Sequence, residues 1–134
     1  MDTTQSRGGT SETAELSTAM VALYKTLFGR GPTKAHSAYA TPDLLICTLE
    51  NSLTPAEQKM VEMGEHQRLR DVRMFFQHAS EPEFVRAVEE ITGRDVRAFV
   101  SGIDTMQDVS SEVFYFHPIG APLVFSADQD GASP

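Results

Sequence analysis

The sequence predicts a single α+β domain in which helices cover one face of a four-stranded antiparallel sheet. Three observations predict it. A helical repeat of apolar residues opens the folded region, two pairs of strand-like segments follow, and helical segments separate the pairs. The expected order is α-β-β-α-α-β-β. The 134 residues suffice for one buried core, and we expect the domain to span residues 11–117, between a disordered tail at 1–10 and a flexible tail at 118–134.

The first helix is predicted by apolar residues that recur every three or four positions, at Leu16, Met20, Leu23 and Leu27. We expect its cap at Thr10 or Ser11, because a hydroxyl side chain can accept hydrogen bonds from the free amides that open a helix. The helix should end at Gly29-Arg30-Gly31-Pro32, since this run of glycine and proline cannot continue it.

The first pair of strands is expected at residues 34–40 and 43–50. The second of them is apolar almost throughout, which is typical of a central strand. The sheet face away from the helices therefore also carries apolar residues, and we predict a homodimer that buries it. Cys47 lies in this strand and is the only cysteine, so we expect a buried thiol and no internal disulfide.

The clearest helix start is Thr54-Pro55-Ala56-Glu57, where Thr54 and Glu57 can cap each other's amides and proline suits the first helical position. This short helix should end near Gly64. A longer helix is expected from Glu65, with a bend at Pro82 before it ends at Gly93.

The last two strands are expected at residues 96–101 and 109–116, paired as an antiparallel hairpin. Beyond them, the apolar run at residues 122–125 could add an edge element or fold against a partner. Stacking of single-stranded RNA on the sheet is a weaker hypothesis, and it would use the aromatic residues Phe99, Phe114, Tyr115 and Phe116.

Composition limits the partners of this domain. The net charge is −8, with 11 Lys and Arg against 19 Asp and Glu, so duplex nucleic acid is not an expected partner, because its phosphates are bound by Lys and Arg. No stretch approaches the roughly 20 apolar residues of a membrane span, and the N-terminal residues lack an apolar leader segment. We therefore expect a cytoplasmic protein that does not insert into a membrane.

No pattern in the sequence predicts catalysis. No serine lies in a Gly-x-Ser-x-Gly turn, and no histidines or cysteines have zinc-ligand spacing. We predict no enzyme activity, no catalytic or metal-binding residue, and no cofactor.

Two basic features are candidate binding sites. Arg68, Arg70 and Arg73 lie in one helical segment, and the helical repeat groups His66, Arg70, Arg73 and Gln77 on the face opposite Leu69, Val72 and Phe76. This face is either solvated or a contact for an acidic partner or a small anion.

The second feature is the turn Gly29-Arg30-Gly31-Pro32, followed by Lys34. Its glycines allow close approach of a ligand, and Arg30 adds charge. A phosphate loop would precede a helix, whereas this turn follows one, and Pro32 has no amide hydrogen. The turn is therefore either a structural corner or a contact for an anion or a partner.

Four stretches in this order resemble the MpsC-like family: residues 23–34 (LYKTLFGRGPTK), Asp43-Leu44, residues 53–57 (LTPAE) and residues 88–96 (VEEITGRDV). The resemblance covers roughly residues 16–117. This chain departs from the family in its Glu81-Pro82 break and in the residues beyond His117. No catalytic residues are established for the family, so the resemblance assigns none here.

The resemblance implies an accessory component of a system that generates membrane potential by sodium translocation, whose companion components resemble transporters of dissolved inorganic carbon. We therefore expect a non-enzymatic cytoplasmic accessory or regulatory protein beside a membrane system for bicarbonate uptake or ion translocation, with a transporter subunit as partner. The alternative is a sensor that binds a small anion or a nucleotide. In either case the expected contact residues are Gly29, Arg30, Gly31, Lys34, Arg68, Arg70 and Arg73.

Overall fold

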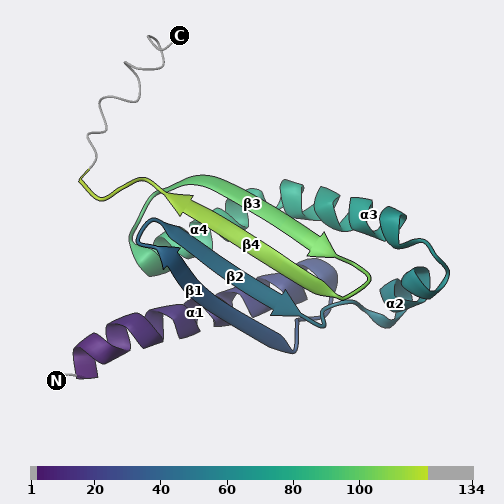
Figure 1. The fold of residues 1–134 in the computed structure, drawn as a ribbon, viewed down its shortest axis with the longest axis horizontal. Helices are drawn as coiled ribbons and strands as arrows, with labels where there is room; N and C mark the ends of the chain where they lie inside the picture. The colour runs from purple at the N-terminus through teal and green to yellow at the C-terminus, as the bar shows by residue number, and fades with distance from the viewer. Residues whose placement is uncertain (1–2, 121–134) are drawn as a thin grey trace, which may run out of the picture.

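The computed structural model describes residues 3–120, with side chains described from Glu12 onward. Four helices and a four-stranded antiparallel sheet form one compact α+β domain, which confirms the predicted fold class (Figure 1). Along the chain the elements are α1 (Thr3–Phe28), β1 (Lys34–Thr41), β2 (Leu44–Glu50), α2 (Pro55–Glu62), α3 (His66–Ala79), α4 (Glu81–Thr92), β3 (Val96–Asp104) and β4 (Val109–Phe116). The apolar run at residues 122–125 lies outside the described residues.

The sheet has the strand order β1-β2-β4-β3, with every neighbouring pair antiparallel. The predicted hairpin of β3 and β4 is confirmed, and β2 is central, as its apolar sequence predicts. Alternate residues of β2 and β4 point toward the helices. On this face the buried apolar residues include Leu45, Leu49, Phe114 and Phe116. Cys47 is buried among them with 1% of its surface exposed, as expected.

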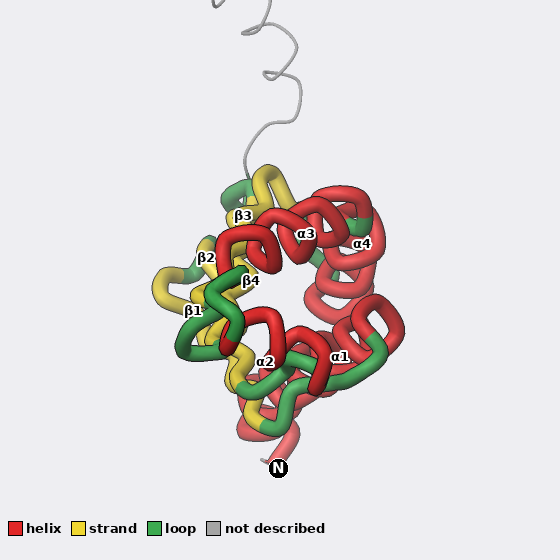
Figure 2. Tube along the Cα trace, turned by 90° about the vertical axis from the view of Figure 1, so that its right-hand side faces the viewer, coloured by secondary structure: helices red, strands yellow, loops and turns green. Residues whose placement is uncertain are grey.

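The helices lie on one side of the sheet, as the end view shows (Figure 2). Leu16, Met20 and Tyr24 of α1 are buried against the core, together with Phe84 and Val88 of α4. α1 begins at Thr3, before the predicted start at Thr10 or Ser11. Among the side chains described, from Glu12 onward, the first buried apolar residue of α1 is Leu16, and Met20 and Tyr24 follow it.

The predicted bend at Pro82 is instead a break between two helices. The amide of Ser80 donates to the carbonyls of Phe76 and Gln77 and closes α3, while its carbonyl accepts from Glu83 and Phe84 and opens α4. Pro82 lies in the first turn of α4, where a missing amide hydrogen has no cost. The fold therefore has one helix more than predicted.

Two other local predictions are confirmed. Thr54 and Glu57 form the reciprocal capping box at the start of α2. The chain leaves α4 through Gly93, which adopts the left-handed conformation that glycine readily takes.

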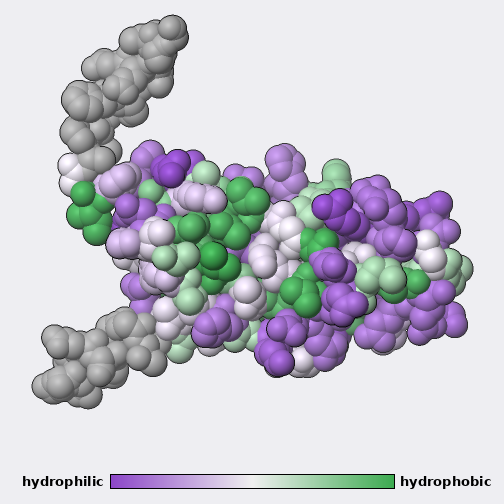
Figure 3. Space-filling view, viewed as in Figure 1, coloured by the Kyte–Doolittle hydropathy of each residue, from purple (hydrophilic) through white to green (hydrophobic). Residues whose placement is uncertain are grey.

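The face of the sheet opposite the helices is open among the described residues. Figure 3 views it directly, and the most hydrophobic side chains gather over the half of the sheet near the β1–β2 turn and the end of β4. On this face lie Leu44, Ile46, Val113 and Tyr115, together with Val100, which is 54% exposed. Of the four aromatic residues considered for RNA stacking, Phe99, Phe114 and Phe116 instead pack on the helix-covered face.

Candidate functional site

The turn Gly29-Arg30-Gly31-Pro32 is a tight corner packed against its own helix. Gly29 has a φ of 85°, a left-handed conformation that ends α1. Gly31 passes so close to the helix that a Cβ atom there would lie 3.1 Å from Val21 Cγ1 and 3.3 Å from the Val21 carbonyl oxygen. The glycines of this turn are thus required by the geometry of the corner.

Arg30 points from this turn to the loop before α2. Its Nη1 donates to the carbonyl oxygen of Asn51 at 2.8 Å and to that of Leu53 at 3.0 Å. Arg30 therefore anchors the loop that leads from β2 into α2.

Arg73 holds the same loop from α3. Its guanidinium makes a two-point ion pair with Glu57, with Nε 2.9 Å from Oε2 and Nη2 2.6 Å from Oε1, and Nη2 also donates to the Ser52 carbonyl oxygen at 3.1 Å. The guanidinium carbon lies 3.8 Å from the centre of the Phe28 ring, in cation–π contact. Burial alone would raise the pKa of Glu57, but the hydrogen bonds from Arg73 and from the Thr54 backbone outweigh it and hold this pKa below its usual value.

The prediction that α3 presents a cationic face is therefore wrong. Arg73 and Gln77 are buried, with 2% and 3% of their surface exposed, and they lie on the inner face beside Leu69. Phe76 and Val72, expected to be inside, are 42% and 44% exposed. The inner face thus combines Leu69 with two residues of the predicted polar face, while Arg70 stays exposed. Arg73 and Gln77 point inward because each of these long side chains finds a distant partner.

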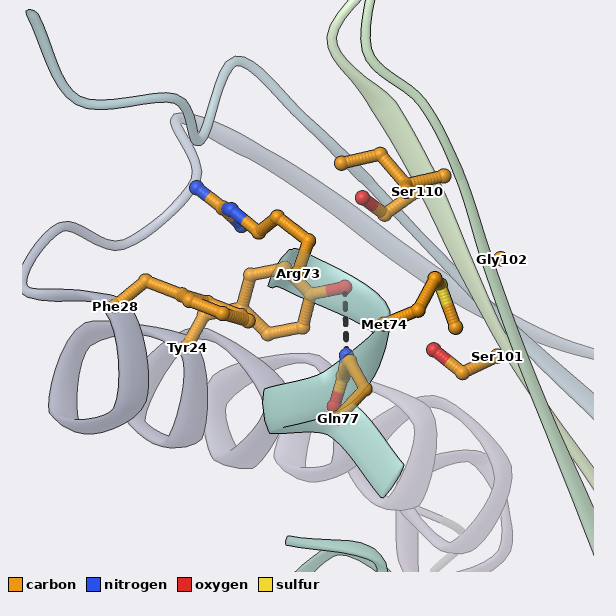
Figure 4. Close-up of a pocket in the computed structure, with 9 residues that line it drawn as sticks. Tyr24, Phe28, Arg73, Met74, Gln77, Ser101, Gly102 and Ser110 are labelled. Carbon is orange, nitrogen blue, oxygen red and sulfur yellow. Dashed lines mark hydrogen bonds between the residues drawn. The ribbon is translucent and has the colours of Figure 1, made fainter. Parts of the chain in front are cut away.

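For Gln77 that partner is Glu112 on β4. Glu112 is fully buried, and its Oε2 accepts hydrogen bonds from the Tyr24 hydroxyl and from Gln77 Nε2. Gln77 Nε2 also lies 3.2 Å from the Tyr24 hydroxyl (Figure 4). Sequence reasoning missed this cluster, because its three members are far apart along the chain.

Burial dominates the chemistry of this cluster. Desolvation raises the pKa of Glu112 to about 7, although the hydroxyls of Tyr24 and Ser101 act in the opposite direction. Glu112 Oε1 and Gln77 Oε1 accept no hydrogen bond of ordinary length from the described residues. The adjoining cavity of about 10 Å³, lined partly by Tyr24 and Gln77, has room for about one water molecule and none for a nucleotide.

The outer face of α3 carries the largest exposed aromatic surface described in the chain. Phe75 is 67% exposed and packs edge-on against Phe76, with ring centres 5.5 Å apart. Val72 lies one turn before them and Arg68 one turn before Val72, so Arg68 borders this apolar face. We refer to Arg68, Val72, Phe75 and Phe76 as the α3 surface.

The structure separates the basic residues predicted to act together. Arg30 and Arg73 converge on residues 51–57 as parts of the fold, whereas Lys34 lies at the start of β1, on the open side of the sheet. Arg68 and Arg70 are exposed on α3, and Arg68 makes an ion pair with Glu65 at 3.4 Å.

A third arginine, Arg94, connects the β1–β2 turn to the residue after β4. Arg94 donates to the Pro42 carbonyl oxygen at 2.6 Å, to Asp43 Oδ1 at 2.5 Å and to the His117 carbonyl oxygen at 3.0 Å, and its guanidinium lies over the Phe116 ring. The sequence stretches that carry the family resemblance thus meet at two places: residues 23–34 with 53–57 through Arg30, and Asp43-Leu44 with 88–96 through Arg94.

Within residues 3–120, no group of three or more His, Cys, Asp or Glu residues is placed to hold a metal ion. Nor does any helix in this part of the chain have the length and apolar character needed to cross a membrane.

Comparison with known proteins gives one match. The family model described as Na⁺-translocating membrane potential-generating system (MpsC) matches residues 10–118. No curated protein and no solved structure is similar enough to match the chain. Since the family model covers nearly all of the domain, including both places where the motifs meet, the chain belongs to the MpsC family.

Proposed function

We propose that this protein is a non-enzymatic accessory or regulatory component that binds a cytoplasmic segment of a membrane protein in an ion-translocating system. The description of its family names a sodium-translocating, membrane-potential-generating system. The observation that carries the proposal is the α3 surface, where two adjacent phenylalanines in contact with each other are exposed.

The chemistry of the α3 surface favours a protein partner. Aromatic residues bordered by an arginine are typical of the centre of protein–protein interfaces, because the rings bury a large area at low entropic cost and arginine pairs with carboxylates. Arg68 already pairs with the carboxylate of Glu65, the residue just before α3. We therefore propose that the bound segment presents apolar side chains to the phenylalanines and an acidic residue to Arg68.

The finer proposal is that the membrane system takes up bicarbonate. It rests on the family resemblance, whose companion components resemble transporters of dissolved inorganic carbon. In this role the protein carries no substrate itself and acts by contact with a transporter subunit.

Two contacts favour this role over the alternative of a sensor for a small anion or a nucleotide. Arg30 Nη1 is engaged by two carbonyl oxygens of the fold, and Gly31 faces Val21 of α1. The anion hypothesis needs both groups to face a ligand.

Affinity for a purified candidate transporter subunit in detergent tests the proposal. Phe75→Ser combined with Phe76→Ser should weaken binding at least about tenfold, as expected when aromatic anchors are removed. The separate variant Arg68→Glu should also weaken binding. Its effect should be larger at low salt concentration, because the repulsion between the introduced negative charge and the acidic partner is then less screened. The matched control is Met106→Ser, which removes an exposed apolar side chain from the turn between β3 and β4, outside the α3 surface. If the double phenylalanine variant and the control bind equally well, the α3 surface is not the contact.

A further inference from the structure

The open face of the sheet is arranged in rows that cross the strands. Strand pairing places Ala38, Ile46, Val113 and Val100 in one row from β1 to β3. The neighbouring row contains Leu44, Tyr115 and Ala98. These two rows form the apolar half of the face seen in Figure 3.

At the other end of the same face is a charged row. Lys34 on β1 is paired with Glu50 on β2, Glu50 with Val109 on β4, and Val109 with Asp104 on β3. The row thus begins with a cation at one edge of the sheet and ends with an anion at the other edge. Lys34 and Asp104 are both exposed.

We propose that two copies of this chain pack their open faces together around a two-fold axis that runs along the strands. Such an axis places each row opposite the same row of the second copy. It also exchanges the two edges of the sheet, so that β1 faces β3 of the second copy. Ile46 then meets Val113, Ala38 meets Val100, and Lys34 meets Asp104, each from one copy to the other. Glu50 lies over Val109 of the second copy, beside its own strand neighbour Lys34. The apolar rows therefore meet each other, and the exposed charges at the two edges of the sheet are complementary.

A two-fold axis in the plane of the interface that runs across the strands does not give this match. It would reverse the order of the rows and lay the charged row over the row of Leu44 and Tyr115. Lys34 and Asp104 would then both lack a partner of opposite charge on the second copy, which is costly for buried charges. Glu50 lies over an apolar side chain in either arrangement, so the contact between Lys34 and Asp104 is what favours the axis along the strands.

The area of the face is at the threshold for a specific dimer. Four strands about 4.8 Å apart and about eight residues long, with a rise of about 3.3 Å per residue, give a footprint of about 500 Å² on each copy. The total of about 1,000 Å² is near the lower limit for a stable interface. Two sheets packed this way lie about 10 Å apart with their strands nearly aligned.

Cross-linking tests the arrangement directly. Ala38→Cys combined with Val100→Cys should give a covalent dimer under mild oxidation, since the two positions face each other between copies. Within one chain they are three strands apart, about 14 Å, too far for a disulfide. Each single variant is the matched control and should stay uncross-linked. A covalent dimer with Ala38→Cys alone would place β1 against β1 and overturn the proposed axis.

Sedimentation velocity of the full chain at tens of micromolar provides the second test. We expect a dimer that Val100→Lys dissociates; Val100 is already exposed in the single copy, so this variant should still fold, as circular dichroism would check. Lys34→Asp and Asp104→Lys should each weaken the dimer about tenfold, because symmetry changes two contacts at once, and the combined variant should restore it. A wild-type monomer, a dimer unaffected by Val100→Lys, or a combined variant no stronger than the single ones would overturn the proposal. The proposal uses the sheet and not the α3 surface, so its failure is distinguishable from failure of the proposed function.

Discussion

Arg73 on α3 and Glu57 on α2 form a two-point ion pair that is closed to solvent on the arginine side, where only 2% of the side chain is exposed against 18% for Glu57. Together with the Phe28 ring above the guanidinium, this pair fixes α2 and the loop before it to the rest of the domain.

Removing one member of this pair should be strongly destabilising. Arg73→Met keeps the length of the side chain but leaves Glu57 without its partner, and we expect a loss of about 3–5 kcal/mol in the free energy of unfolding. Urea denaturation followed by circular dichroism measures it. Arg70→Met, on the exposed side of the same helix, is the control and should change stability by less than about 0.5 kcal/mol. Equal effects of the two variants would contradict a structural role for Arg73.

The close approach at Gly31 predicts the effect of a single methyl group. Gly31→Ala should destabilise by about 1–3 kcal/mol, because the new Cβ would be only 3.1 Å from Val21 Cγ1. Val21→Ala in the same chain removes that atom and should recover part of the loss, although the backbone oxygen of Val21 remains 3.3 Å away. Strictly additive effects in this double-mutant cycle would show that Val21 is not what Gly31 accommodates.

Glu112 should make stability depend on pH. Its pKa is raised from 4.5 to about 7 in the folded protein, so between these values the folded state binds more protons than the unfolded state. The free energy of unfolding should therefore fall as the pH rises from 4.5 to 7, by about 3 kcal/mol at about 1.4 kcal/mol per pH unit. Tyr24 and Cys47, which also face Glu112, titrate well above this range.

Glu112→Gln tests this dependence, because the amide keeps the shape and an oxygen that can accept from Tyr24 and Gln77. Denaturation at several pH values should give a flatter profile for this variant, with the gain in stability largest above pH 7. Glu90→Gln on the exposed face of α4 is the control and should keep the wild-type slope. A slope that survives Glu112→Gln would assign the pH dependence to another group.

Cys47 should react slowly with thiol reagents. Burial raises its pKa to about 11, against the smaller opposite effect of the hydrogen bond from Ser37, so little thiolate is present at neutral pH and the sulfur is covered. We expect reaction with a disulfide reagent to be at least about 100-fold slower in the native protein than in guanidinium chloride. A cysteine placed at the exposed position Arg70 should react rapidly in both states. Comparable rates for native Cys47 and the exposed cysteine would mean that β2 opens readily.

Most of the fold could be predicted because its signals are local. The capping box at Thr54 and Glu57, the glycine after α4 and the apolar run of β2 each depend on a few adjacent residues. α3 could not be predicted in the same way. Its inner face takes Leu69 from the predicted apolar group and Arg73 and Gln77 from the predicted polar group. This choice depends on Glu57 and Glu112, which lie 16 and 35 positions from Arg73 and Gln77. A rule that places phenylalanine inside and arginine outside chooses wrongly when such partners exist.

The candidate site was predicted only in part for the same reason. The turn at Gly29 and the basic residues of α3 stand out in the sequence, but the sequence does not show that Arg30 and Arg73 reach one loop. Nor does it show that Phe75 and Phe76 remain uncovered. Whether Gly29, Arg30, Gly31, Lys34, Arg68, Arg70 and Arg73 contact an anion or a partner stays a prediction.

The inner face of α3 has a further consequence for motion. Its buried residues are one leucine and two polar side chains, and α2 has no buried residue at all, whereas α1 and α4 are held by fully buried apolar groups. Local opening should therefore begin at α2 and α3, whose amides should exchange with solvent deuterium before those of β2 and β4. Because Glu57 binds Arg73 and Glu112 binds Gln77, we expect the rate at which these two helices open to depend on pH as well as on temperature.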